Sequence, residues 1–312
     1  MLQSPTDLPV FCSGATGYIG GAILRALAAQ GVPALGGLRK SQPLHEGIGP
    51  LITGDLAEPG LKLPPVQAVV HAAGLGHRRG VSAETWRRQN VDAAVNLAKA
   101  AREAGARRFI LISTAYIHGR THAGLVTDTT PPSPMDFYAE SKLQAEHDVA
   151  GVFGPGLTII RPVAVIGPSC PGNVQLLLKF IRRGIPLPFA GIQNRRSFIH
   201  RDDLAAIVLA ALAAEKPPES ILAAHPESIS TPDLVRALAD GLEAKDKLFD
   251  CPSQLLSAAA TLLGRAPMWQ SLSGNFIANP VCARAIGWSP AETLAESFVQ
   301  VARYHHTTVP NA

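Results

Sequence analysis

Tyr138 and Lys142 are the side chains of this 312-residue chain whose types and spacing could move a proton. They stand four positions apart, and residues 139–146 read as helix, so the phenol and the ammonium share one helix face. A phenol with its ordinary pKa of about 10 is a poor base at neutral pH, but an adjacent ammonium favours the phenolate. The pair therefore predicts a tyrosine acid/base whose pKa the lysine lowers. Such pairs also occur by chance on helix surfaces. Other sequence features are therefore needed to decide between a catalytic pair and a surface pair without function.

A glycine-rich segment, residues 13–20, could bind phosphate groups. Gly14 permits a tight turn, Gly17 lets the backbone approach a pyrophosphate, and Gly20 lets the following helix lie close to the preceding strand. The phosphates would meet free N–H groups at the positive end of the helix dipole. A plain glycine-rich turn is the alternative, but the position between the first predicted strand and the first predicted helix favours a dinucleotide site.

The end of the second predicted strand, residues 35–40, indicates which dinucleotide to expect. An NAD site normally places a carboxylate there for the adenosine ribose hydroxyls, and this segment has none. Arg39 could instead bind a 2′-phosphate through two N–H groups. NADP(H) is therefore the preferred cofactor and NAD(H) the alternative. The other interpretation of Arg39 and Lys40 is a merely solvated loop.

The elements that must position these residues alternate in the first half of the chain. Short apolar runs are separated by amphipathic helical stretches, which predicts βαβ units and an α/β fold with a Rossmann-type, doubly wound parallel sheet. Thr114 directly follows one predicted strand, at the sheet edge where such folds bind ligands, and its hydroxyl could hydrogen-bond a substrate carbonyl. The predicted strands are 10–12, 33–38, 68–72, 109–113 and 158–161.

From Gly167 onward the composition shifts to proline, glycine and irregular spacing. We expect a Rossmann domain that binds NADP, made of residues 1–166 with 197–225, and a smaller C-terminal α/β lobe that binds substrate, made of residues 167–196 with 226–312. The apolar segment 255–263 is expected to pack internally, with pocket lining and membrane contact as alternatives. Helices are predicted over 174–183, 202–214, 232–242 and 254–263.

Composition excludes several classes of protein. With 46% hydrophobic and 17% charged residues, the chain has ample apolar surface for a core, which excludes general disorder. The net charge of +4 is too small and too dispersed to indicate nucleic-acid binding. The four cysteines lack metal-ligand spacing, so no metal site is expected, and no apolar run is long enough for an integral membrane segment. A cytoplasmic location is expected.

The order of these features resembles the short-chain dehydrogenase/reductase superfamily: a glycine turn, then a strand that ends at Thr114, then the tyrosine–lysine helix. It is most similar to the extended branch, the epimerase/dehydratase family of nucleotide-sugar epimerases, dehydratases and reductases. Further segments match that family along nearly the whole chain. They are Gly54-Asp55-Leu56, Val69-Val70-His71-Ala72-Ala73, Asn90-Val91-Asp92, Arg161-Pro162 and Arg196-Ser197-Phe198-Ile199-His200.

The resemblance implies roles for individual residues. Tyr138 would be the acid/base, Lys142 would lower its pKa and hold the nicotinamide ribose, and Thr114 would orient the reacting oxygen. Asn173 and Arg196 match positions that contact a nucleotide-sugar diphosphate; a helix cap and a solvated arginine are the alternatives, and neighbouring Arg195 could take the second role. The implied cofactor-binding residues are Gly14, Thr16, Gly17, Tyr18, Ile19, Gly20, Arg39, Asp55, Leu56, His71, Ala72, Ala73, Asn90, Tyr138 and Lys142.

The run from residue 172 to residue 197 looks like bacterial 4-keto reductases. That likeness implies NADPH-dependent reduction of a nucleotide-linked 4-keto-6-deoxy sugar, with a UDP-sugar as the expected substrate, for surface polysaccharide biosynthesis. The alternatives are a nucleotide-sugar 4-epimerase with bound NAD, a small-carbonyl reductase, and a non-catalytic NADP(H) sensor. A homodimer is expected by analogy alone. The basic segment 77–79 is expected to be a solvated loop, with a contact to the substrate diphosphate as the alternative.

Overall fold

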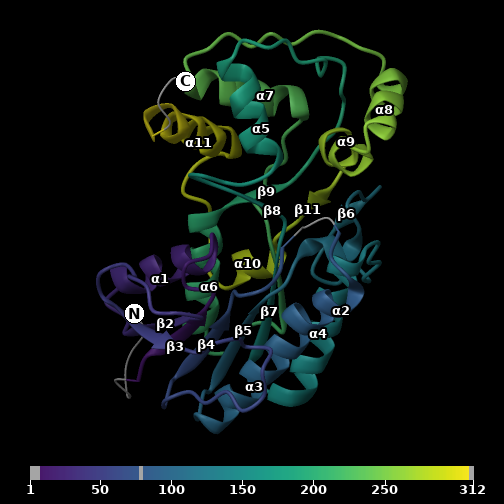
Figure 1. Ribbon diagram of the computed structural model, residues 1–312. Helices are drawn as coiled ribbons and strands as arrows, with labels where there is room; N and C mark the ends of the chain where they lie inside the picture. The colour runs from purple at the N-terminus through teal and green to yellow at the C-terminus, as the bar shows by residue number, and fades with distance from the viewer. Residues whose placement is uncertain (1–7, 77–79, 309–312) are drawn as a thin grey trace.

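The computed structural model describes residues 8–76 and 80–308, and a seven-stranded sheet lies at its centre (Figure 1). The strand order is β10-β7-β5-β4-β1-β2-β3, and every paired neighbour in this sheet runs parallel. The predicted doubly wound, Rossmann-type sheet is therefore confirmed. Its strands are β1 (Val10–Ser13), β2 (Ala34–Leu38), β3 (Ile48–Ile52), β4 (Ala68–His71), β5 (Arg108–Ile112), β7 (Leu157–Pro162) and β10 (Ser220–Ala223).

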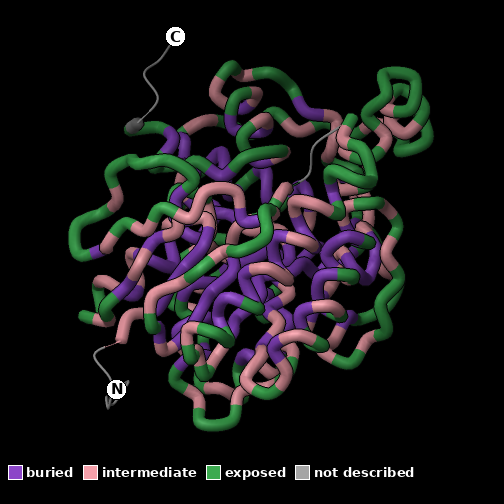
Figure 2. The backbone as a smooth tube through the Cα atoms, turned by 60° about the horizontal axis from the view of Figure 1, so that its bottom comes forward, coloured by how far each residue is buried: buried purple, intermediate pink, exposed green. Residues whose placement is uncertain are grey.

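Helices cover both faces of this sheet because its strands are apolar on both sides. On β5, Ile110 and Ile112 belong to the core on one face, whereas Phe109 and Leu111 belong to the core on the other. Such continuous apolar runs are typical of parallel strands buried between two helical layers. In Figure 2 the purple of buried residues fills the interior, and green exposed segments form the rim.

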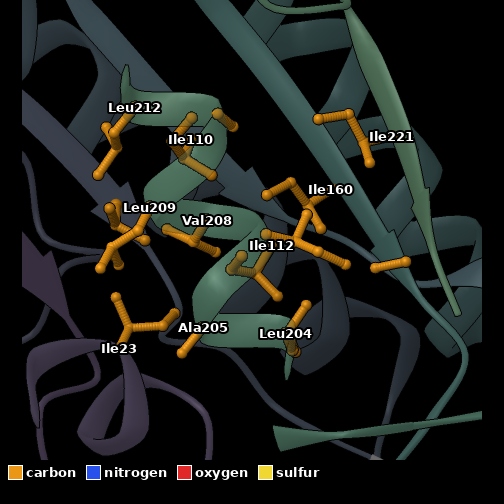
Figure 3. Packing of buried hydrophobic residues seen from close by; sticks show 14 of the residues in the cluster. Ile23, Ile110, Ile112, Ile160, Leu204, Ala205, Val208, Leu209, Leu212 and Ile221 are labelled. Atoms are coloured by element: carbon orange, nitrogen blue, oxygen red, sulfur yellow. The ribbon is translucent and has the colours of Figure 1, made fainter. Parts of the chain in front are cut away.

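One helical layer consists of α1 (Gly20–Ala29) and α6 (Arg201–Ala213), which pack against each other and on the sheet. Leu204, Val208 and Leu212 recur every fourth residue along α6 and therefore form one apolar stripe. Figure 3 shows this stripe beside the isoleucines of β5 and β7. The opposite layer consists of α2 (Ala83–Trp86), the π-helical turn η1 (Arg87–Asp92), α3 (Ala93–Glu103) and α4 (Phe137–Phe153).

A second core lies beyond the carboxyl ends of the strands, at the top of Figure 1. There α5 (Asn173–Arg182), α7 (Thr231–Gly241) and α11 (Leu294–Thr308) pack around Leu238 and Phe298, both fully buried. The chain enters this region through β8 (Ala164–Ile166) and returns through its parallel partner β9 (Phe198–His200). The remaining short elements are η2 (Ala115–His118), β6 (Leu125–Val126), α8 (Ser253–Leu262), α9 (Ala266–Ser273), β11 (Ile277–Ala278) and α10 (Val281–Ala285).

The expectation that residues 255–263 pack internally is wrong. The segment is helical as predicted, but none of the residues of α8, all of which the structure describes, is buried. Leu262 is 88% exposed and Leu263 is 72% exposed. Within residues 8–76 and 80–308, no helix is long and apolar enough to cross a membrane, and no group of three or more His, Cys, Asp or Glu side chains could hold a metal ion.

The β1–α1 turn yields a prediction about stability. A Cβ at Gly20 would overlap the carbonyl oxygen of Gly14, so Gly20→Ala should lower the free energy of unfolding by about 1–3 kcal/mol. Gly151 is the matched control, because it lies inside α4 with open space where its Cβ would be. Gly151→Ala should stabilise by about 0.5–1 kcal/mol through helix propensity. Urea unfolding of both variants tests this, and equal effects would contradict the steric argument.

Candidate active site

The glycine turn is closed and leaves the start of α1 open to an anion. The N–H of Gly17 donates to the carbonyl of Gly14 at 2.8 Å. Gly14 has φ +71°, and a Cβ there would lie 2.8 Å from the nitrogen of Ala73. No side chain caps α1 at Ile19, and no acidic residue stands in its first turn. This backbone cradle at a helix N-terminus fits the pyrophosphate of a dinucleotide.

Arg39 follows β2 and stands exposed at the carboxyl edge of the sheet. Its Nη2 donates to Oε1 of Gln89 at 2.8 Å. The carboxylate of Asp55, after β3, accepts from the Ala57 N–H at 3.1 Å and pairs with the Arg88 guanidinium at 3.0 Å. Leu56 is buried beside it. The edge near the end of β2 therefore presents a guanidinium, and the nearby carboxylate is already paired with another arginine.

The Ser13 side chain holds His71 and the segment after it in place. The Ser13 hydroxyl is hydrogen-bonded to Nδ1 of His71 at 2.8 Å and accepts from the Ala73 N–H at 3.2 Å. Burial, and then the nearby charge of Lys142, lower the pKa of His71 to about 3, so the imidazole is neutral. These contacts hold residues 71–73 against the glycine turn, where the sequence predicts a cofactor contact.

Asn90 is buried, and its amide connects Leu75, in the loop after β4, to α4. Its Oδ1 accepts from the Leu75 N–H at 2.8 Å, and its Nδ2 donates to the Ser141 hydroxyl at 2.9 Å. The amide therefore braces two elements of the site. The predicted direct contact between Asn90 and the cofactor stays a prediction.

Tyr138 lies in the first turn of α4, which Asp136 caps by accepting from the Ala139 N–H at 2.9 Å. The Tyr138 phenol and the Thr114 hydroxyl are hydrogen-bonded to each other. The Trp86 ring packs against the Tyr138 ring edge-on, with ring centroids 5.6 Å apart. The structure thus brings the predicted acid and the predicted orienting hydroxyl together at the carboxyl end of β5.

Lys142 lies one helical turn further along α4 and is buried. Its Nζ donates to the carbonyl of Ile112 at 2.6 Å. Burial lowers the pKa of Lys142 to about 8, and the Glu146 carboxylate opposes that shift. The ammonium form therefore still predominates at pH 7.

The predicted acidification of the phenol is wrong in this structure. Burial raises the pKa of Tyr138 to about 12, although the hydrogen bond with Thr114 partly opposes it. Desolvation is the largest influence on this pKa, and the helical spacing of Tyr138 and Lys142 does not encode burial. Tyr138 is consequently protonated at neutral pH, as a proton donor must be.

A buried ionic network lies behind these residues. Glu146 of α4 pairs with Arg161 of β7 at 2.7 Å and accepts a hydrogen bond from the Ser113 hydroxyl. Glu146 and Ser113 are both buried, and Arg161 is nearly so. Arg161 belongs to a segment that matches the family, Arg161-Pro162, but the match assigns it no role. Glu146 was not predicted, although it stands four residues after Lys142 on the same helix face.

A cavity of about 700 Å³ opens in front of Thr114 and Tyr138 and extends toward the second core. Asn173 and Arg196 line it, so four of the five residues predicted for catalysis or substrate binding surround one space, and Lys142 does not line it. Asn173 begins α5 after Gly172, and no side chain caps that helix. Arg196 is buried and donates to the carbonyls of Gly274 at 3.0 Å and Arg120 at 3.2 Å. The alternative of a merely solvated arginine is therefore wrong.

Two cavity residues were missed by the sequence analysis. Arg120 pairs with Asp136 through Nη2 at 2.6 Å and Nε at 3.0 Å, and its guanidinium lies 5.9 Å from the centre of the Tyr116 ring. Asp136 thus caps the helix of Tyr138 and also holds a second guanidinium at the cavity wall. Its position two residues before Tyr138 was the available signal. Arg195 donates to the Ser228 carbonyl instead of lining the cavity, and the basic segment 77–79 lies outside the described residues.

A model of the NAD dependent epimerase/dehydratase family matches residues 10–224. The chain belongs to this family, as its resemblance implied, and is an NAD(P)-dependent enzyme of the extended short-chain dehydrogenase/reductase type. It is 30% identical to the UDP-glucose 4-epimerase of Vibrio cholerae over 255 residues, 78% of each chain. It is 29% identical to the ceramide reductase of Caulobacter vibrioides over 277 residues, 85% of this chain and 80% of the reductase.

Among solved structures, MoeE5 in complex with UDP-glucose and NAD has a TM-score of 0.76 to this chain. The match covers 97% of this chain and 100% of MoeE5, at 20% identity. At that identity the likeness establishes the fold, which agrees with the sheet order described above.

The Glu146 network yields a prediction about pH dependence. Glu146→Gln removes the charge that raises the pKa of Lys142, so that pKa should fall further below about 8. Activity that needs the ammonium is present below this pKa and is lost above it. The alkaline limb of the kcat/KM profile should therefore move to lower pH. The free energy of unfolding should fall by about 3 kcal/mol.

Glu140→Gln is the control for this experiment, because Glu140 is exposed on the same helix. It should leave the alkaline limb in place. An unmoved limb in Glu146→Gln would show that the carboxylate does not act through Lys142.

Proposed function

We propose that this enzyme reduces the keto group of a nucleotide-linked 4-keto-6-deoxy sugar with NADPH. One observation carries the proposal: the Tyr138 phenol and the Thr114 hydroxyl are hydrogen-bonded to each other at the wall of a cavity of about 700 Å³. Reduction of a ketone needs a proton donor beside the carbonyl oxygen from the start. A phenol with a pKa of about 12 is in the donor form throughout the physiological range.

In the proposed reaction, bound NADPH supplies a hydride to the keto carbon. Tyr138 gives its proton to the carbonyl oxygen, so that the C=O group becomes CH–OH and the phenol becomes a phenolate. Thr114 donates a hydrogen bond to the same oxygen and orients it. The nearby ammonium of Lys142 stabilises the phenolate until solvent returns the proton. Each of these roles follows the family match residue by residue.

The cradle formed by Gly14, Gly17 and the open N-terminus of α1 fits the cofactor's pyrophosphate. We propose NADPH in preference to NADH, because Arg39 provides a guanidinium at the end of β2, that strand end carries no carboxylate of its own, and the nearby Asp55 is paired with Arg88. We further propose that residues 1–166 with 197–225 bind this cofactor and that residues 167–196 with 226–312 bind the substrate.

For the substrate we propose a UDP-sugar of surface polysaccharide biosynthesis, used in the cytoplasm. Arg196 and Arg120 bring two guanidinium groups to one cavity wall, and Asn173 brings an uncapped helix start. Such groups suit the two phosphates of a nucleoside diphosphate. MoeE5, which shares the fold, has been solved with UDP-glucose, and this supports the choice of nucleotide.

A nucleotide-sugar 4-epimerase is the second candidate, and the 30% identity to the Vibrio cholerae UDP-glucose 4-epimerase favours it. An epimerase begins by oxidising its substrate, which requires a base and a retained NAD. The guanidinium of Arg39, which suits NADPH, counts against a retained NAD. Purified enzyme that holds stoichiometric, non-exchanging NAD would overturn the reductase proposal.

Tyr138→Phe tests the proposed proton donor. We expect turnover of a UDP-linked 4-keto-6-deoxy sugar, followed as loss of NADPH absorbance, to fall about 10²–10⁴-fold. The dissociation constant for NADPH, measured by fluorescence, should change little because the ring remains. Tyr304→Phe, at an exposed position of α11, is the control and should be fully active. An unaffected rate in Tyr138→Phe would reject Tyr138 as the acid.

Arg39→Gln tests the proposed cofactor preference. A charge-assisted hydrogen bond to phosphate is worth about 1.5–3 kcal/mol, so the dissociation constant for NADPH should rise roughly 10–100-fold. Binding of NADH, which lacks the 2′-phosphate, should not change. Arg303→Gln removes an exposed guanidinium on α11 and should affect neither dinucleotide. Equal weakening of both dinucleotides would show that Arg39 does not contact the 2′-phosphate.

A further inference from the structure

Helix α8 presents leucines to solvent instead of burying them. All of its residues are described, none is buried, and Leu255, Leu262 and Leu263 are 63%, 88% and 72% exposed. Single exposed apolar side chains are normal on a protein surface, but a helix whose leucines all lie outside the core is not. In Figure 1, α8 stands at the edge of the molecule beside α9, the helix against which it packs.

The exposed leucines form a continuous stripe. Leu255 and Leu262 are seven residues apart and therefore lie on the same helix face, two turns from each other. Leu256 and Leu263 repeat this spacing one residue further along, and only alanines, Ser257 and Thr261 separate the two pairs. A helix of 10 residues is about 15 Å long, too short to cross a bilayer but long enough to lie in its surface.

The charges around the stripe distinguish a lipid surface from most protein partners. Residues 251–291 contain no Asp or Glu, and between residues 251 and 283 the sole charged side chain is Arg265. Arg265 is exposed just beyond the end of α8. The nearest preceding carboxylate, Asp250, lies against the backbone of Gly191. An apolar stripe that ends in a cation and has no carboxylate on its own segment suits a layer of anionic headgroups.

Helix α9, against which α8 packs, forms part of the cavity wall. Arg265 leads directly into α9, and Pro267, Met268 and Leu272 of α9 line the cavity that contains Tyr138. Contact of α8 with a surface would therefore place the cavity close to that surface.

We propose that α8 docks this enzyme on an anionic lipid bilayer, with the leucine stripe among the acyl chains and Arg265 at the headgroups. The contact is peripheral and leaves the core of the protein in the aqueous phase. It would hold the cavity, part of whose wall is α9, close to the lipid surface. The docking itself does not depend on the identity of the substrate.

Vesicle sedimentation of the full chain tests the proposal. Vesicles of phosphatidylcholine with phosphatidylglycerol should carry the protein down, and vesicles of phosphatidylcholine alone should carry much less. The triple variant Leu255→Ser, Leu262→Ser and Leu263→Ser should bind the anionic vesicles at least tenfold more weakly. Since the three positions are exposed, the thermal unfolding midpoint should be retained, and this measurement checks folding independently of any enzyme assay.

Leu125→Ser is the matched control, because Leu125 is 52% exposed on β6 and does not belong to α8. It should sediment like the unmodified protein, and Arg265→Gln should weaken binding to the anionic vesicles alone. Undiminished sedimentation of the triple variant would overturn the proposal. A second outcome would also overturn it. In that outcome the unmodified protein does not bind vesicles but forms a concentration-dependent dimer in analytical ultracentrifugation, and the triple variant abolishes this dimer.

Discussion

The buried carboxylate of Glu146 is the group on which the geometry of the active site depends. It joins α4 to β7 through Arg161 and to the end of β5 through Ser113. Lys142 and Tyr138 lie about one and two turns before it on the same helix, and Thr114 directly follows Ser113. A buried ion pair adds little net stability after desolvation. We infer that its contribution is positional, because any slip of α4 along the sheet would leave these charges unpaired.

Burial sets the protonation states in front of this network. It raises the pKa of Tyr138, and it lowers the pKa of Lys142 and of His71. The three shifts share their largest cause, since desolvation always disfavours the charged form. Their result is a neutral phenol, a neutral imidazole and an ammonium held by the Ile112 carbonyl. This combination suits a site that delivers a proton, and it links the packing of α4 to the proposed direction of the reaction.

Local sequence predicted those parts of the fold that local periodicity determines. The β1–α1 turn and α6 follow from glycine spacing and apolar stripes, and both occur as predicted. β3 was missed because Gly49 and Pro50 interrupt its apolar pattern. The role of Arg120 was missed because a long loop brings it to Asp136, and spacing alone does not encode that loop. The pKa of Tyr138 was predicted with the wrong sign because desolvation depends on packing from distant elements.

The cavity has two unlike walls, and their difference bears on the proposed substrate. Hydroxyl and guanidinium groups, among them those of Tyr138 and Arg120, line one part of the cavity. Val174, Leu177 and Leu234 form much of the wall toward the second core. A 6-deoxy sugar carries a methyl group where an ordinary hexose carries a hydroxymethyl group, and burying one such carbon is worth about 0.8 kcal/mol. The hydroxyl of an ordinary hexose would lose its water against those side chains without gaining a partner. If the proposed sugar lies against these side chains, the apolar lining would favour the deoxygenated sugar over its parent, independently of how the diphosphate is held.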